Sequence, residues 1–299
     1  MKLATFAASA NDAPRLGAVV DQDRLLLDLA TVRDAPFEDM SMLGLIDAGD
    51  TGLDWVRNAV AHASGELLPI AQAHLFAPIP RPRKNVFCVG WNYVAHFDEG
   101  SKTRSAATEL PEHPTFFTKA STAVIGPHDA ILIDRTITEK LDWEAELGVV
   151  IGRRGKNIAQ SSAMEHVWGY MVINDITGRE VQRRHGNQWF KGKSLDSSCP
   201  MGPWIVTADA LDPADLAIQC RVNGVAKQAS TTRRMFFGIP SILEELSHGL
   251  TLEPGDVIAT GTPEGVGHAR VPPEFLARGD VVETEVSGIG KLRNIVGPP

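Results

Sequence analysis

The sequence predicts a mixed, β-rich α+β protein in which a small N-terminal α+β domain precedes a larger, strand-rich domain. Over residues 85–299, short apolar segments are separated by Gly, Pro and Asp, which is typical of short strands joined by turns. Helical patterns are few and do not alternate regularly with the strands, which argues against βαβ winding. Three prolines fall within residues 77–84. Because proline continues neither a helix nor a central strand, we interpret residues 78–84 as a linker.

Residues 1–77 carry the patterns of the small domain. The start, MKLATFAASANDAP, has too short an apolar stretch and too few basic residues for a signal peptide, so it predicts a strand. The segment RLGAVVDQDRLLLDL predicts a hairpin that turns at residues 21–23. Two further segments, MSMLGLIDAG and LDWVRNAVAHA, predict short helices.

The larger domain is predicted from short strand and helix patterns along residues 85–299. The strand segments are NVFCVGW, TFFTKAS, AILI, ELGVVIG, WGYMVINDIT, PWIVTA, LAIQCRVNG, DVIATG and VVETEV. The helical segments are chiefly SSAMEHV, GIPSILEELSHG and PPEFLA.

Composition narrows the classes of function. The chain has 299 residues, with 43% hydrophobic and 22% charged, as expected for a globular protein with a full-sized core. A net charge of −8 argues against non-specific nucleic-acid binding. No apolar run approaches the ~18–20 residues of a membrane span. The three cysteines show neither a CxxC pattern nor a disulfide framework, so a reducing cytoplasm is the predicted location.

The segment LDWEAELGVVIG, residues 141–152, places acids where a buried strand is predicted. In an extended strand Asp142, Glu144 and Glu146 share one face. Buried carboxylates without partners are costly, and three on one face repel each other. A solvated face is the usual explanation for such alternation. A divalent cation over the face would instead offset the cost, and oxygen-only ligands favour Mg²⁺, Mn²⁺ or Ca²⁺ over zinc.

Two other segments supply candidate partners for that site. Asp175, in GYMVINDITGREVQ, ends an apolar run, and an acid there is costly unless it has a function; a turn residue is the alternative. His96 and Glu99, in NYVAHFDE, are three residues apart and share one face of a helical turn. A carboxylate beside an imidazole is typical of a general base, whereas an exposed surface pair is the more frequent arrangement.

Several familiar catalytic motifs are excluded. The segment GNQWFKGKS, residues 186–194, resembles a phosphate-binding loop but has five residues, not four, before Gly-Lys. The Gly-rich segment TGTPEGVG lacks the GxGxxG spacing of a dinucleotide site. No GxSxG motif is present, so a serine hydrolase is not expected.

Taken together, these segments resemble the fumarylacetoacetate hydrolase family. WEAELGVVIG, GYMVINDITGREVQ, QWFKGKSLDSSCPMGPWIV, RVNGVAKQ and ATGTPEGVG follow one another in the order and spacing of that family, over about residues 85–299. The resemblance implies a β-roll catalytic domain, a cofactor of Mg²⁺ or Mn²⁺, and a homodimer formed by the β-rich domain. It implies metal ligands at Glu144, Glu146 and Asp175, with Asp142 supporting them from outside the ligand set.

The same resemblance implies catalytic residues. His96 and Glu99 match a family motif, NYxxHxxE, in which the pair activates a water. The polar run of residues 100–114 fits a lid that orders over bound substrate. Lys193 matches an active-site lysine whose implied task is to hold a substrate oxygen and stabilise enolate charge.

Substrate contacts are implied at three further positions, Arg179, Gln182 and Thr262. These residues would hold the carboxylate of an α-keto acid, a task that suits the planar fork of arginine. His185 and His268 lie near the same motifs and are expected to serve structure or line the pocket.

The predicted function is metal-dependent hydrolysis of a C–C bond in a 2,4-dioxo (1,3-diketo) acid, such as an acylpyruvate or fumarylpyruvate. The metal would chelate the 2-oxo acid, the dyad would activate water, and Lys193 would help to hold the expelled enolate. The alternatives are decarboxylation of oxaloacetate and isomerisation of 2-hydroxyhepta-2,4-diene-1,7-dioate, which would use the same chelation and enolate. A catalytically idle metal-binding or ligand-binding protein is a further alternative, and the combination of ligands, dyad and lysine argues against it.

Overall fold

The computed structural model describes residues 1–100, 109–186 and 188–298, whose strands form three sheets. Twelve strands belong to one large sheet. They are β1 (Lys2–Ala7), β2 (Arg15–Val20), β3 (Leu25–Asp28), β4 (Glu66–Pro69), β5 (His74–Leu75), β6 (Val86–Gly90), β7 (Thr115–Lys119), β8 (Val124–Ile125), β11 (Ala145–Ile151), β12 (Val167–Asn174), β14 (Cys199–Thr207) and β17 (Val257–Ala259).

A second sheet has five strands and a third has two. The five are β9 (Ile131–Leu132), β15 (Ala217–Val222), β16 (Val225–Thr231), β18 (Val281–Val286) and β19 (Gly290–Gly297), and the two are β10 (Leu141–Asp142) and β13 (Thr177–Gly178). The α-helices are α1 (Met42–Ala61), α2 (Val94–Glu99), α3 (Arg179–Arg184), α4 (Phe190–Lys193) and α5 (Ile239–Ser247). None of the helices in the described residues combines the length and the apolar character that a transmembrane span requires.

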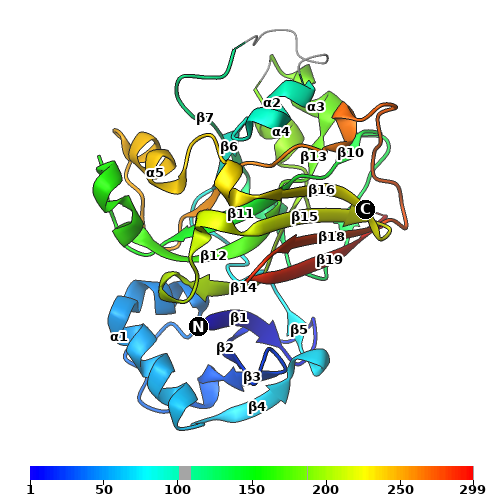
Figure 1. Ribbon diagram of the computed structural model, residues 1–299. Coiled ribbons are helices and arrows are strands. Elements are labelled where there is room, and N and C mark those ends of the chain that lie inside the picture. Colours follow the sequence, from blue (N-terminus) through cyan, green and yellow to red (C-terminus); the bar gives the residue numbers. More distant parts are fainter. Residues whose placement is uncertain (101–108, 187, 299) are drawn as a thin grey trace.

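The N-terminal elements form as the sequence predicts and gather at one end of the molecule (Figure 1). Strands β2 and β3 make the hairpin, whose turn at residues 21–23 has positive φ throughout. The two predicted helices lie in one element, α1, which is broken at Gly49, where φ is 57°. Ser41 caps its start by accepting a hydrogen bond from the Gly44 amide at 3.2 Å.

The N-terminal strands continue the large sheet. Strand β1 pairs antiparallel with β14, so Leu3 lies opposite Ile205. Apolar residues from both sides of the proline-rich segment, among them Leu3 and Ile205, pack in one hydrophobic cluster. The two parts of the chain on either side of residues 78–84 therefore share a sheet and a core. Their division into two domains stays a prediction.

Register in the middle of the large sheet positions the site. Strand β11 pairs antiparallel with both β12 and β17, and β11 and β12 are buried along their whole lengths. In this register Ala145 lies opposite Asn174 and Glu146 lies opposite Ile173. The start of β11 and the end of β12 therefore lie side by side, at the same end of these two paired strands.

Three local predictions differ from the structure. The strand expected through residues 141–152 is broken, since β10 ends at Asp142, pairs with β13, and is separated from β11. No helix forms at residues 272–277, because the amides of Glu274 and Leu276 donate to the carbonyls of Gly267 and Leu141 instead. The segment SSAMEHV lies in a 3₁₀ helix, Gln160–His166, rather than an α-helix. Strands β16 and β19 were not predicted; each has a buried amide side chain, Gln228 or Asn294, where an apolar residue is expected.

Candidate metal centre and active site

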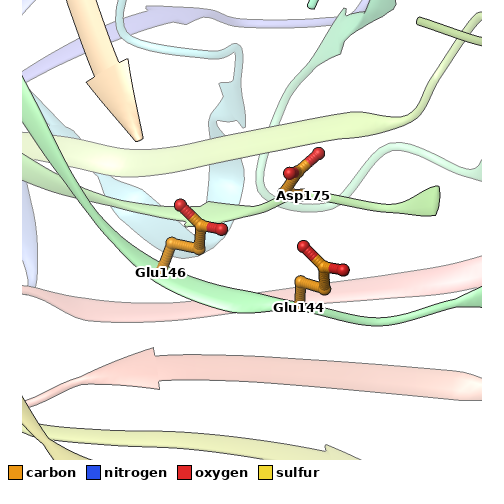
Figure 2. A group of neighbouring side chains, drawn as sticks. All are labelled: Glu144, Glu146 and Asp175. Atoms are coloured by element: carbon orange, nitrogen blue, oxygen red, sulfur yellow. The ribbon is translucent and has the colours of Figure 1, made fainter. Parts of the chain in front are cut away.

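Three carboxylates meet where β11 begins and β12 ends (Figure 2). Glu146 lies in β11, Glu144 lies just before it, and Asp175 directly follows β12. One oxygen from each lies within 4.8 Å of the others, and all three side chains are buried. The Asp175 amide donates to the Glu144 carbonyl at 2.8 Å, which fixes the two segments together. The sequence prediction that these three residues share a site therefore agrees with their geometry.

Lys193, the last residue of α4, lies against two of these carboxylates. Its Nζ is 2.6 Å from both Glu144 Oε2 and Asp175 Oδ2. Burial alone would lower the pKa of the Lys193 ammonium, but Asp175 and Glu144 outweigh burial and hold that pKa above its ordinary value. The side chain therefore stays a buried cation at the edge of the carboxylate group.

A second buried lysine, Lys119, was not predicted from the sequence. It ends β7 and its Nζ donates to Asp175 Oδ1 at 2.7 Å, to the Ile176 carbonyl at 3.0 Å, and to the carbonyl of Lys193. The signal that could have found it is the position of a lysine at the end of an apolar strand, as Asp175 ends β12. Lys119 fixes both Asp175 and the turn that carries Lys193.

The two glutamates differ in their electrostatic surroundings. Burial would raise the pKa of Glu144, but Lys193 and Arg179 outweigh it and lower that pKa well below its usual range. Glu146 accepts a hydrogen bond from the Gly261 amide at 2.8 Å, yet burial, followed by repulsion from Asp175 and Glu144, raises its pKa well above the usual range. An ionised Glu146 would therefore lack the cationic partner that Glu144 has.

The donor set fits a hard divalent cation. All three groups offer carboxylate oxygens, which Mg²⁺ and Mn²⁺ accept readily. With every group ionised, the buried charged side chains in and around this group comprise four carboxylates and three cations, an excess of one negative charge. They are Asp142, Glu144, Glu146, Asp175, Lys119, Arg179 and Lys193.

Arg179, at the start of α3, is engaged by the protein itself. Its Nε donates to Asp142 Oδ2 at 2.8 Å and its guanidinium lies 2.7 Å from Glu144 Oε1. The remaining nitrogen is 3.4 Å from the oxygen of half-buried Gln182. Arg179 therefore orients Glu144, and its contact with a substrate carboxylate stays a prediction.

Asp142 lies outside the carboxylate group and holds Arg179. Burial would raise the pKa of Asp142, but Arg179 and then His268 outweigh it and lower that pKa. The acid also accepts hydrogen bonds from the amides of Gly267 at 2.6 Å and His268 at 3.0 Å. His268, whose side-chain role the sequence left open, lies beside this pair with its Nδ1 3.2 Å from Asp142.

Thr262 and His185, which were also singled out in the sequence, make no hydrogen bond or ion pair with the three carboxylates among the residues that the structure describes. The Thr262 hydroxyl donates to the Ala145 carbonyl at 2.9 Å and accepts from Gln228 at 2.8 Å, so it braces the start of β11. His185 is exposed beyond the end of α3. A substrate contact from Thr262 stays a prediction.

The His96–Glu99 dyad forms on α2. His96 Nδ1 is 2.8 Å from Glu99 Oε1, and Glu99 Oε2 accepts from the Gly265 amide at 2.8 Å. The two side chains are 11% and 20% exposed, which distinguishes them from the surface pair of His113 and Glu245, at 68% and 34%. Residues 101–108 of the predicted lid lie outside the described residues.

Two glycines connect the dyad and the carboxylates to one loop. Gly261 donates to Glu146 and Gly265 donates to Glu99, and both have φ near 100°. A side chain is disfavoured at such φ values. At Gly265 a Cβ atom would also lie 2.1 Å from the carbonyl of Lys227.

Comparison with known proteins identifies the family to which this geometry belongs. Residues 85–297 match the family described as fumarylacetoacetate (FAA) hydrolase C-terminal. The chain belongs to the fumarylacetoacetate hydrolase family. One curated member, oxaloacetate tautomerase YisK from Bacillus subtilis (strain 168), is 38% identical over 294 residues, covering 94% of this chain and 96% of the relative. The chain is therefore similar to a tautomerase along nearly its whole length.

Solved structures of the family share the fold. A fumarylacetoacetate hydrolase from psychrophilic Exiguobacterium antarcticum is 39% identical, with a TM-score of 0.83 and full coverage of both chains. Maleylpyruvate hydrolase from Sphingobium sp. SYK-6, in complex with manganese(II) and pyruvate, is 29% identical, with a TM-score of 0.78 and coverage of 100% and 99%. The predicted family and β-rich fold are confirmed, and the chain is an enzyme of this family.

Proposed function

We propose that this protein is a divalent-metal-dependent enzyme that interconverts the keto and enol forms of oxaloacetate. The observation that carries the proposal is the buried group of Glu144, Glu146 and Asp175 with the Lys193 ammonium at its edge. This arrangement suits a substrate that gains negative charge on an oxygen during reaction. The similarity to a tautomerase over 94% of the chain supports that substrate over others.

Glu144, Glu146 and Asp175 would hold Mg²⁺ or Mn²⁺. When bound, such an ion supplies a Lewis acid that chelates a 2-oxo carboxylate and favours its enolate. The manganese and pyruvate in the related maleylpyruvate hydrolase structure support this assignment. A small 2-oxo acid is accordingly the proposed ligand.

The dyad would move the proton. Tautomerisation takes a proton from the carbon beside the carbonyl group and adds one to the oxygen. Because Nδ1 of His96 faces the Glu99 carboxylate, it carries the hydrogen, and Nε2 offers its lone pair to the substrate. His96 would take the carbon-bound proton on Nε2 and return it to the enol oxygen, while Lys193 stabilises the intervening charge.

A second candidate is hydrolysis of a C–C bond in a 2,4-dioxo acid such as an acylpyruvate or fumarylpyruvate. The same part-buried dyad favours it, because an imidazole oriented by a carboxylate can activate water. Oxaloacetate decarboxylation and isomerisation of 2-hydroxyhepta-2,4-diene-1,7-dioate would pass through a similar enolate. These reactions differ in which bond breaks, so their products separate them.

The test follows both tautomers and products in one preparation. Protein stripped with chelator is reloaded with Mg²⁺ or Mn²⁺, and loss of the ultraviolet absorbance of the oxaloacetate enol is measured. Proton NMR of parallel samples detects pyruvate from oxaloacetate and from a panel of 2,4-dioxo acids. We expect metal-dependent loss of the enol that is faster than any release of pyruvate. Faster release of pyruvate from a 2,4-dioxo acid would contradict the tautomerase proposal and support the hydrolase.

A further inference from the structure

Tyr93 carries a buried hydroxyl for which the fold supplies no partner. The side chain is 1% exposed, and among the described residues its hydroxyl makes no hydrogen bond. Burying an unpaired hydroxyl costs free energy, so such groups in folded proteins call for an explanation. A ligand that accepts a hydrogen bond is one such explanation.

The position of Tyr93 links it to both halves of the site. It caps the start of α2, where its carbonyl accepts from the Phe97 amide at 2.9 Å, and it lies three residues before His96. The preceding residue, Asn92, donates to the Thr260 carbonyl at 2.8 Å. Thr260 adjoins Gly261, whose amide bonds Glu146. Tyr93 is thus held between the dyad helix and the loop that supports the carboxylates.

The charges around the hydroxyl define the ligand atom that suits it. Burial, followed by the negative charges of Glu146 and Glu264, raises the pKa of Tyr93, so the group stays a neutral donor. Glu264 Oε2 is itself buried and, within the described parts of the chain, has no partner. A ligand carboxylate near these two acids would be repelled, whereas a carbonyl oxygen would not.

We propose that the Tyr93 hydroxyl donates a hydrogen bond to the carbonyl oxygen of a bound 2-oxo acid and stabilises the charge that develops there in the enolate. Tyr93 then joins Lys193 as a group that touches the reacting oxygen. This role rests on the proposed function, because it requires a 2-oxo acid in the site. No proton is transferred in this role, so the balance of the reaction is unchanged.

Kinetics of two matched variants give the first test. The chain has two tyrosines, and the other, Tyr170, lies in β12 and lines a separate surface recess. Tyr93→Phe should lower kcat about 10²-fold, as for loss of one oxyanion donor, with KM, metal content and Tm little changed. Tyr170→Phe removes the same atom elsewhere and should leave kcat unchanged. Equal kcat values in wild type and Tyr93→Phe would overturn the role.

Spectroscopy gives a readout that does not depend on turnover. In a Tyr170→Phe background, protein labelled with ¹³Cζ-tyrosine has a single tyrosine signal, from Tyr93. The probe is pyruvate, whose carbonyl oxygen stands for that of the substrate. We expect the signal to shift when pyruvate is added to Mg²⁺-loaded protein, and not when Mg²⁺ is added alone.

The outcomes separate the two proposals. An unmoved signal in protein that calorimetry shows to be saturated with pyruvate would overturn the role of Tyr93 and leave the proposed function standing. A wild-type protein that neither binds pyruvate nor interconverts the tautomers would overturn the proposed function, and the role of Tyr93 with it.

Discussion

Lys193 is the cation that pairs with two of the three carboxylates of the candidate metal site. Its ammonium contacts Glu144 and Asp175 at 2.6 Å each, while Lys119 bonds the other oxygen of Asp175. In a buried site each carboxylate needs such a partner, because desolvation is costly. Glu146, which bonds a backbone amide and no lysine or arginine, is the residue at which a metal ion would add most.

Lys193→Met tests this balance. Removing one partner of a buried ion pair costs about 3–5 kcal/mol, so the variant should be less stable by roughly that amount and inactive. Added Mg²⁺ should restore part of the stability, because it binds the folded state. The control is Lys191→Met, an exposed lysine two residues away, which should behave as wild type. Urea unfolding with and without Mg²⁺ measures both effects, and equal stability of the two variants would contradict the charge balance.

Glu146 should make metal binding depend on pH. Its raised pKa means that the metal-free protein holds a proton there at pH values where a normal glutamate is ionised. A metal ion binds the carboxylate form, so binding releases that proton. Affinity should therefore fall about tenfold per pH unit below the pKa of Glu146 and level off above it.

Calorimetry of Mn²⁺ binding in buffers of different ionisation enthalpy counts the released protons. Glu146→Gln should lose the proton release together with most of the affinity. Glu283→Gln, at a partly buried glutamate that pairs with Lys291 in the second sheet, is the control and should keep both. Affinity that is flat between pH 5 and pH 8, without proton release, would refute the assignment of Glu146.

Helix α2 connects the proton-transfer pair to the rest of the site at the scale of elements. Trp91 lies three residues before α2. Its ring packs edge-on against the ring of Trp189, the residue that precedes α4, with ring centroids 4.9 Å apart. The Glu99–Gly265 hydrogen bond ties the end of α2 to the loop after β17. The helix that carries the dyad is thus positioned by contacts from two other elements.

His96→Ala should separate chemistry from metal binding. Loss of general acid–base catalysis should lower kcat roughly 10²–10⁴-fold. Metal affinity should remain, because His96 is not among the three carboxylates. His113→Ala, in the exposed His113–Glu245 pair, is the control and should have no effect. Steady-state kinetics and metal titration measure the two effects. Equal activity of the two variants would contradict the catalytic role of the His96–Glu99 pair.

Gly265→Ala tests whether the loop positions the dyad. The added Cβ meets the Lys227 carbonyl and the φ of the residue is positive, so the loop must shift, and we expect its hydrogen bond to Glu99 to be disturbed. We expect a loss of roughly 1–3 kcal/mol in stability from the strained backbone and a lower kcat. Gly224→Ala has the same sign of φ in the turn between β15 and β16, with nothing within 4 Å of its Cβ. It should lose stability while keeping kcat, and a parallel loss of kcat in both would argue against the positioning role.

Across the whole molecule, the N-terminal strands and the strand-rich part form one continuous sheet through β1 and β14. An unpaired strand edge invites association with other chains. Deleting residues 1–77 would expose the edge of β14 and the shared cluster around Ile205, so we expect that fragment to aggregate in size-exclusion chromatography. A monodisperse fragment that still binds Mn²⁺ would instead support two independent domains. The homodimer and the cytoplasmic location stay predictions.

The sequence by itself indicated where the candidate carboxylate ligands would lie, because spacing along one chain segment limits where side chains can lie. Glu144 and Glu146 are two residues apart at the start of an apolar run, and Asp175 ends another such run. Both facts place acids at the ends of buried strands, and this placement does not depend on the order or register of the strands in the sheet. The hairpin turn at residues 21–23 was predictable for the same reason, as was the pairing of His96 with Glu99.

Only the tertiary structure decided which distant groups meet those residues. Lys119 is 56 residues from Asp175, and the Arg179–Asp142 pair depends on how β10 and β13 align. A lysine or arginine in a sequence is usually solvated, so nothing local marks it as buried. The unpartnered hydroxyl of Tyr93 is likewise visible only once its neighbours are known. Contacts between elements follow from sheet register and packing, and these depend on the whole chain rather than on any one segment.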